Sequence, residues 1–307
     1  MESRAEPWTA EVELTAQSAA GLVAQQFPQL GAPLLRPLGE GWDNAAYLVN
    51  DAWVFRFPRR AVAAGLIATE SRILPLVAPA LPLPVPVPVF VGRASAGYPW
   101  PFVGYRVLRG TPISNTPTCE CDDPELARAL GKFLRALHAI DAKPLVAAGL
   151  PEDTIGRLDH VRMRPKFFER LSALDAAGLV RNAGVLMAFL DRVAPAGARP
   201  ERLAVAHGDL YARHVLVDAR LQAAGVIDWG DVHHGDPALD LAIAFSVVAP
   251  GARDAFFEAY APVDSRTLEL ARYRAIYHSV MTAHYGLRVG DTELIEAGTR
   301  GLRLALD

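Results

Sequence analysis

The residues with the most chemical potential lie close together in the last third of the chain. The sequence HGDLYARH occupies 207–214, and IDWG occupies 227–230. Asp209 stands in a predicted loop before a short strand that His214 opens, and Asp228 ends the return strand of the hairpin. Because a hairpin brings its two ends together, we expect His214 and Asp228 to converge, with Asp209 projecting toward the same place.

Two carboxylates and an imidazole in this order suit phosphoryl transfer. The reaction needs a carboxylate that orients an acceptor hydroxyl and takes up its proton, and ligands that hold Mg²⁺ on the nucleotide phosphates. We predict Asp209 as the catalytic base, with His214 and Asp228 as metal ligands. A single Asp beside glycine is usually a turn residue and a single His is usually a hydrogen-bonded or surface residue, so the prediction depends on the joint spacing.

The first 109 residues have the pattern of a small sheet with one inserted helix and a second helix in front. Leucine and valine alternate with proline over 81–88, which predicts an extended connection. We predict helices over 9–27 and 64–76, the second ended by prolines, and strands over 34–38, 45–49, 53–57, 87–91 and 102–108.

The remainder of the chain has mainly helical patterns. We predict helices over 124–139, 157–174, 184–193, 252–260 and 265–285, and hairpin strands over 215–217 and 225–227. The sequence therefore predicts an α+β fold with a β-rich N-terminal lobe, 1–109, that binds nucleotide. An α-helical C-terminal lobe, 110–307, is expected to hold the catalytic and substrate-binding residues.

These motifs together resemble the aminoglycoside phosphotransferase family of small-molecule kinases. The resemblance covers nearly the whole chain and implies a protein-kinase-like two-lobed fold, with Asp209 as base and Asp228 as a magnesium ligand. The family usually has Asn where this chain has His214. The macrolide phosphotransferase branch is similar to this chain here, with HGDLYxxH. The resemblance therefore implies a macrolide or an aminoglycoside as acceptor.

The N-terminal lobe resembles the family's nucleotide site. Gly39 and Gly41 precede a strand, as in the nucleotide-positioning loop, although such a pair is also typical of a hairpin turn. Arg56 stands where many relatives have a phosphate-binding Lys, and no lysine occurs before Lys132. Glu70 on the following helix is expected to pair with Arg56, although it could be an ordinary solvated charge.

The strand that contains Tyr105 and Val107 resembles the one that leads to the hinge of the family. Backbone groups there would bind the purine edge, and backbone recognition leaves little trace in side-chain identity. The prediction is therefore a nucleoside triphosphate donor with Mg²⁺, and the choice between ATP and GTP stays open.

The charge pattern gives mixed indications about the acceptor. Acidic residues would suit a polycationic aminoglycoside, and Asp231, Asp236, Asp240 and Glu258 are candidates. The range 157–170, however, contains five basic and two acidic residues. If this predicted helix lines the cleft, it favours a neutral, weakly basic or anionic acceptor; otherwise it is a solvated face.

The composition excludes other classes of protein. A formal net charge of −3 is not typical of a nucleic-acid-binding protein, and two cysteines exclude a disulfide scaffold. Cys119 and Cys121 are interpreted as free thiols. The uncharged range 73–92 holds six prolines, so no membrane span is expected there. With no signal peptide pattern, we expect a cytoplasmic protein, a monomer or weak dimer, with no nucleic-acid or membrane partner.

Other functions remain open at this point. A metabolite kinase for a sugar or amino alcohol would have the same motifs. A pseudokinase that binds nucleotide without turnover would be consistent with His214 and Arg56, whereas the presence of Asp209 and Asp228 opposes it. A protein kinase is disfavoured because the range 228–236 is too short for an activation loop.

Overall fold

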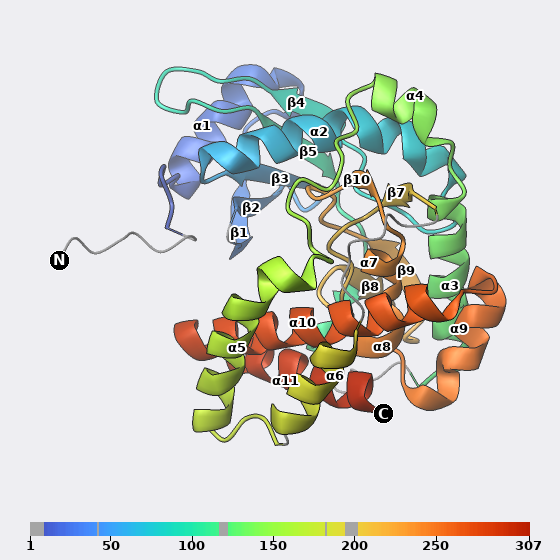
Figure 1. The fold of residues 1–307 in the computed structure, drawn as a ribbon. Helices are drawn as coiled ribbons and strands as arrows, with labels where there is room; N and C mark the ends of the chain where they lie inside the picture. Colours follow the sequence, from blue (N-terminus) through green and yellow to red (C-terminus); the bar gives the residue numbers. More distant parts are fainter. Residues whose placement is uncertain (1–8, 42, 117–121, 182, 194–201) are drawn as a thin grey trace. The chain divides into compact units, whose positions relative to one another are not determined.

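The chain forms two compact units (Figure 1). The computed structural model describes residues 9–41, 43–116, 122–181, 183–193 and 202–307. The first unit comprises Met1–Pro79, Val85–Leu108 and Asp228–Asp231, and the second comprises Ala80–Pro84, Arg109–Ile227 and Val232–Asp307. The first is built on an antiparallel sheet and the second is mainly helical, so the predicted α+β class is confirmed.

The sheet of the first unit has five antiparallel strands in the order β1-β2-β3-β5-β4. The predicted strand pair at 45–49 and 53–57 is confirmed, with Asn50 and Asp51 in the turn at positive φ. The strands are β1 (Leu35–Glu40), β2 (Asn44–Val49), β3 (Trp53–Pro58), β4 (Phe90–Gly92) and β5 (Phe102–Arg106).

The two faces of the sheet have different roles because side chains alternate along β3. Phe55 and Phe57 are fully buried in an aromatic core that also contains Phe27 and Phe102. Gly104 is required beside this core, since a Cβ there would lie 2.6 Å from the Phe55 ring. The intervening residues of β3 face the other side, where helix α2 (Ala61–Val77) packs on β3 and β5.

The first helix is shorter than predicted. It is α1 (Ala16–Gln26), and Thr15 caps it by accepting from the Ser18 N–H at 3.1 Å. Upstream, the N–H groups of Glu11 and Val12 both donate to the Arg59 carbonyl, at 2.9 and 3.1 Å. The prediction of helix from residue 9 was wrong because these bonds fix the preceding segment beside the end of β3.

Helix α2 includes Pro75 and ends at Val77, which agrees with the predicted end at residue 76, before the prolines that follow. Pro75 lies in the last turn, where its fixed φ is compatible with a helix and only one hydrogen bond is lost. Together with the 3₁₀ turn that follows, Ala61–Ala80 is long and apolar enough to cross a membrane by length and composition alone. A core helix passes the same test, and α2 carries buried residues on the side that packs on the sheet.

The second unit holds the remaining elements (Figure 1). The sequence analysis made no specific prediction for the helices Ala142–Ala147, Ala238–Leu241, Ile243–Ser246 and Thr292–Leu306, or for the strands Thr111–Pro112, Ala204–Ala206 and His233–Gly235. The helices are α3 (Pro124–His138), α4 (Ala142–Ala147), α5 (His160–Ala176), α6 (Ala183–Arg192), α7 (Ala238–Leu241), α8 (Ile243–Ser246), α9 (Arg253–Tyr260), α10 (Ser265–Val289) and α11 (Thr292–Leu306). The strands are β6 (Thr111–Pro112), β7 (Ala204–Ala206), β8 (Val215–Val217), β9 (Ala223–Val226) and β10 (His233–Gly235).

Two strand pairs of this unit frame the HGD loop. The buried strand β7 ends at Ala206 and pairs with β10, so that Ala206 lies opposite His233. The hairpin β8–β9 begins after His214 and pairs Val215 with Val226. The loop of 207–214 is therefore held at both ends by paired strands.

Helix α10 is the main support of this unit and packs against α5, α7 and α11. Its contact with α11 is unusually close because the facing residues of α11 are glycines. A Cβ at Gly298 would lie 2.4 Å from the Ala283 nitrogen, and one at Gly301 would lie 2.4 Å from Ser279 Oγ. Backbone atoms of α10 therefore require glycine at position 298, whereas a side chain at position 301 would force Ser279 Oγ to move.

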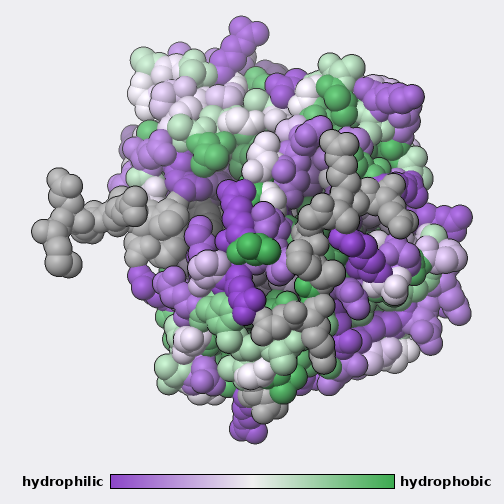
Figure 2. Space-filling view, viewed as in Figure 1, coloured by the Kyte–Doolittle hydropathy of each residue, from purple (hydrophilic) through white to green (hydrophobic). Residues whose placement is uncertain are grey.

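Hydrophobic residues on the surface are scattered. On the face shown in Figure 2, hydrophilic and hydrophobic residues are interspersed. Exposed apolar side chains such as Leu34, Val62 and Val161 come from different elements. Single exposed apolar residues of this kind are ordinary for folded proteins.

Candidate active site

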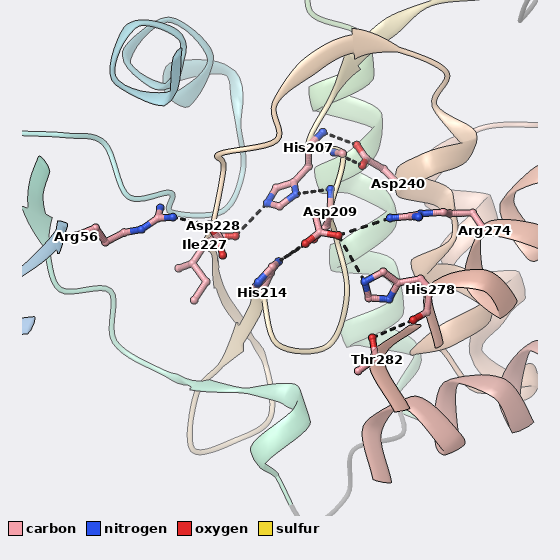
Figure 3. Close-up of polar contacts among 11 residues, drawn as sticks. Arg56, His207, Asp209, His214, Ile227, Asp228, Asp240, Arg274, His278 and Thr282 are labelled. Atoms are coloured by element: carbon pink, nitrogen blue, oxygen red, sulfur yellow. Dashed lines mark hydrogen bonds and ion pairs between the residues drawn. The ribbon is translucent and has the colours of Figure 1, made fainter. Parts of the chain in front are cut away.

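The backbone of the HGD loop is held by a buried carboxylate. Asp240 on α7 is fully buried and accepts from the N–H groups of His207 and Gly208, at 2.7 and 2.8 Å (Figure 3). It also contacts His138 Nε2 at 3.1 Å, and His138 Nδ1 in turn lies 2.8 Å from the Tyr260 hydroxyl. Burial raises the pKa of Asp240, but His138 and the backbone donors outweigh it and hold the pKa below its usual value.

His207 links this loop to the end of the hairpin. Its Nε2 lies 3.0 Å from the Ile227 carbonyl oxygen, and its Nδ1 accepts from the Asp209 N–H at 3.3 Å. These partners assign the neutral tautomer with the proton on Nε2. Burial lowers the pKa of His207, which also favours the neutral ring. His207 therefore acts as a structural bridge to the residue that precedes Asp228.

The carboxylate of Asp209 faces three nitrogen groups (Figure 3). Its Oδ1 lies 3.5 Å from His278 Nε2 and 3.6 Å from Arg274 Nη2, and its Oδ2 lies 3.9 Å from His214 Nδ1. Burial opposes ionisation, but His278, His214 and Arg274 hold the pKa of Asp209 well below its usual range. The side chain is 27% exposed, so an ionised carboxylate is accessible to an acceptor.

His214 is oriented by the same loop. Its Nδ1 donates to the Asp209 carbonyl oxygen over 2.7 Å, which leaves the lone pair of a neutral ring on Nε2. The His214 carbonyl accepts from the Ile227 N–H at 2.9 Å, and the ring lies 4.3 Å from that of Tyr211. A nitrogen lone pair in this orientation is suitable for a metal ion or a bound water, although Mg²⁺ prefers oxygen ligands.

Asp228 belongs to the first unit and has a different set of partners. It follows Ile227 directly and has a left-handed backbone, with φ 64°. Its Oδ1 accepts from Arg56 Nη2 at 2.6 Å, while its side chain remains 45% exposed. A half-exposed carboxylate is the kind of single protein ligand that nucleotide-bound Mg²⁺ uses, together with phosphate oxygens and waters. The residues described contain no cluster of three or more metal-type ligands.

Arg56 and Glu70 pair as predicted. Arg56 Nη1 donates to both Glu70 oxygens, at 2.9 and 3.2 Å, and Glu70 is fully buried. Burial opposes the charged guanidinium, but Glu70 and Asp228 raise the pKa of Arg56 above its ordinary value. Arg56 therefore holds Glu70 with one nitrogen and Asp228 with the other. Tyr105, on the neighbouring strand β5, is buried beside this group, and burial raises its pKa.

The glycine loop and the segment after β5 lie in the same unit. Gly39 has φ 157°, and the Gly41 N–H donates to the Asn44 carbonyl at 2.9 Å. Arg59 donates to the Gly41 carbonyl at 3.1 Å. The Val107 N–H donates to the Ala52 carbonyl at 3.0 Å. That N–H is therefore already used within the protein, which limits what Val107 could offer to a purine.

The acidic residues predicted for the acceptor are placed apart from one another. Asp231 is half-buried in the first unit. Asp236 accepts from the Ala238 N–H at 2.9 Å at the start of α7, and burial raises its pKa. Glu258 is exposed on α9, which packs on α3. Asp240, the fourth candidate, is fully buried and holds the HGD loop instead of facing an acceptor.

Two residues of α10 that lie against Asp209 were not identified from the sequence. Arg274 and His278 are four residues apart, so both lie on one face of the helix. The spacing was visible, but no sequence pattern indicated that this face would meet Asp209. Cys119 and Cys121, interpreted as free thiols, lie outside the residues that the structure describes.

The chain is similar to known phosphotransferases over most of its length. A model of the phosphotransferase enzyme family APH matches residues 34–276. The structure resembles the GDP complex of wild-type aminoglycoside 2'-phosphotransferase-IIIa, with 25% identity, coverage of 95% of this chain and 98% of that one, and a TM-score of 0.69. It also resembles macrolide 2'-phosphotransferase MphH from Brachybacterium faecium, with 25% identity, coverage of 93% and 98%, and a TM-score of 0.58.

A curated relative adds a partial match. The uncharacterized protein YcbJ of Bacillus subtilis (strain 168) is 24% identical over 155 residues. The match covers 46% of this chain and 47% of that protein, so it spans about half of each.

Proposed function

The chain belongs to the APH phosphotransferase family, and on that basis we propose that it transfers the γ-phosphate of ATP or GTP to a hydroxyl of a small molecule. The observation that carries this proposal is the environment of Asp209. Neighbouring nitrogen groups hold the pKa of its carboxyl well below the usual range, its side chain is partly exposed, and Asp240 fixes the backbone of its loop. This is the arrangement that a base needs in order to orient a hydroxyl and receive its proton.

The groups that already contact the two carboxylate oxygens of Asp209 suggest which oxygen would bind the acceptor hydroxyl. His278 and Arg274 approach Oδ1, whereas among the residues that the structure describes the nearest ion-pair partner of Oδ2 is the more distant His214. In our proposal, Oδ2 accepts the hydrogen bond of the acceptor hydroxyl and takes its proton as the new oxygen–phosphorus bond forms. The bond between the γ-phosphorus and the bridging oxygen breaks in the same step, and the nucleoside diphosphate leaves. Asp209 thus mainly positions the hydroxyl, since phosphoryl transfer depends on position and charge more than on covalent chemistry of the protein.

The donor half rests on residues of the first unit. Arg56, fixed by Glu70, would contact the nucleotide phosphates, and Gly39 and Gly41 would let the backbone approach them. Asp228 would hold Mg²⁺, with His214 as a second candidate ligand. The ion would neutralise charge on the transferred phosphate. Tyr105 and Val107 would border the purine. Solved relatives bound to GDP, ADP and ATP are consistent with a nucleoside triphosphate donor.

We propose an antibiotic as acceptor, and a macrolide ahead of an aminoglycoside. Solved structures similar to this chain include phosphotransferases of both classes. The HGDLYxxH pattern favours the macrolide class, and Asp236 and Asp240 are occupied by contacts within the protein. Asp231 and Glu258 remain acidic candidates for an aminoglycoside. A metabolite kinase for a sugar or amino alcohol is the second candidate function.

A phosphate-transfer screen tests this proposal. Purified protein with Mg²⁺ and either ATP or GTP would be incubated with erythromycin, kanamycin and glucose, and products would be identified by mass. We expect erythromycin to gain one phosphate with the wild-type protein and none with Asp209→Asn. Nucleotide binding by calorimetry without transfer to any acceptor would contradict the proposal and support a pseudokinase.

A further inference from the structure

Building on the proposed kinase function, we propose that Arg274 determines acceptor specificity by keeping polycations away from Asp209. Arg274 lies on α10, and its side chain is only 9% exposed. Its Nη2 lies 3.6 Å from Asp209 Oδ1, next to His278 Nε2 at 3.5 Å. The site therefore has a buried cation built against the carboxylate that must receive the acceptor.

This cation is permanent because a guanidinium stays protonated at any physiological pH. It compensates the negative charge of Asp209. His278 lies beside it, and burial lowers the pKa of His278, so this ring acts as a neutral donor. An acceptor ammonium that approached the base would find a carboxylate whose negative charge Arg274 already compensates, so it would gain little attraction there. The same arrangement does not penalise a neutral hydroxyl compound.

Of the other carboxylates of this unit that were candidates for binding amines, two are already engaged and the third is exposed on α9. Asp236 accepts from the Ala238 N–H, and Asp240 is fully buried against His207, Gly208 and His138. Glu258 is exposed on α9, a helix that packs on α3. None of these three carboxylates has the position of Arg274 beside the base.

A second basic side chain approaches α10 from its neighbour. Arg170 of α5 contacts Met281, which lies about one turn beyond His278, and α5 packs against α10 (Figure 1). The basic range noted in the sequence is therefore on a helix that borders α10. This placement adds positive charge to the same side of the unit.

An aromatic ring lies beside His278, the residue that approaches Asp209 together with Arg274. The ring of Tyr211 is 4.4 Å from that of His278 and 4.3 Å from that of His214. Aromatic faces of this kind pack well against the carbon face of a sugar ring. The structure thus offers stacking together with charge exclusion, which suits an acceptor with no more than one amine.

The test compares erythromycin, which has one amine, with kanamycin, which has several. The measured quantity is the ratio of kcat/KM for erythromycin to that for kanamycin. Arg274→Gln removes the charge at similar size, and Arg274→Lys keeps the charge as the matched control. We expect a ratio well above one for wild type, a fall of about tenfold or more in Arg274→Gln, and little change in Arg274→Lys. Melting temperature and nucleotide binding report whether each variant folds.

Several outcomes would contradict this inference. A wild-type preference for kanamycin would overturn it, and so would transfer with an unchanged ratio in Arg274→Gln, which would leave the kinase proposal intact. Absence of transfer to every acceptor would overturn the kinase proposal and this inference together. If Arg274→Gln fails to fold, Arg274→Met, which also removes the charge, takes its place in the same comparison. An unchanged ratio in that variant would contradict the inference.

Discussion

Arg56 Nη2 lies 2.6 Å from Asp228 Oδ1, and Nη1 of the same guanidinium holds the buried Glu70. One side chain of strand β3 thus fixes two carboxylates that are far apart in the sequence. A lysine has one ammonium nitrogen on a flexible stem and cannot reproduce this fork. Because this chain has Arg56 where many members of the resembling family have lysine, the proposed metal ligand Asp228 is held by one nitrogen of a guanidinium.

We predict that Arg56 is required for stability as well as for activity. Arg56→Gln leaves Glu70 buried without its cation and should destabilise the fold by about 3–5 kcal/mol. Arg56→Lys should retain more stability but lose at least about tenfold in kcat, because a single nitrogen must serve both carboxylates. Chemical denaturation and steady-state kinetics would measure both effects. Equal stability of Arg56→Gln and wild type would contradict the role of the pair.

Asp209→Asn should abolish phosphate transfer while nucleotide affinity stays near that of wild type. The amide has a similar shape but cannot take up a proton, so we expect a loss of at least about a hundredfold in kcat. Asp254→Asn, an exposed position on α9, is a suitable control. Turnover in Asp209→Asn within a few-fold of wild type would exclude Asp209 as the base.

His214→Asn tests whether the imidazole is replaceable. If His214 only supplies one polar ligand, the variant should retain activity within about tenfold of wild type and shift the concentration of Mg²⁺ needed for half-maximal rate. Asn is also the residue usual in the resembling family. Complete inactivity with normal nucleotide binding would instead demonstrate a specific need for the imidazole.

Asp240 should make the stability of the protein depend on acidic pH. Its pKa is lower in the folded state than in the unfolded chain, so its contribution is present above the unfolded value of about 4 and decreases as pH falls through the folded value. Asp240→Asn places an NH₂ group against a backbone donor and should cost about 1–3 kcal/mol at neutral pH. The difference in unfolding free energy between wild type and Asp240→Asn should shrink below about pH 4. A difference that is constant with pH would contradict this assignment.

Local patterns predicted part of this structure well. Alternating apolar residues and turn residues predicted the hairpin β2–β3, and an amphipathic stripe predicted helix α3. The pairing of Arg56 with Glu70 was predicted from the family resemblance and from the position of Arg56 on its strand. The start of α1 could not be predicted, because backbone bonds from Glu11 and Val12 to Arg59 decide it. The short strands β7 and β10 were missed because a run of three residues is too short for an alternating pattern to be recognised.

The candidate site was likewise predictable only where its residues belong to a local motif. Asp209, His214 and Asp228 belong to a local motif with recognisable spacing. Arg274 and His278 contact Asp209 only because α10 packs beside the HGD loop, and this long-range packing leaves no mark in the local sequence. The role of Asp240 was misassigned for the same reason, since its burial depends on His138 from a helix about a hundred residues earlier.

The glycines of α11 have a practical consequence for anyone who shortens or tags this protein. Gly301 sits against Ser279, the residue next to His278, so the last helix of the chain braces the part of α10 that faces Asp209. Deleting the fifteen residues of α11 would remove no proposed catalytic group. It would still remove packing that supports the part of α10 in contact with Asp209, so we expect the position of the Asp209 carboxylate to become less well fixed. The C-terminal end of this chain is therefore a poor place for truncation.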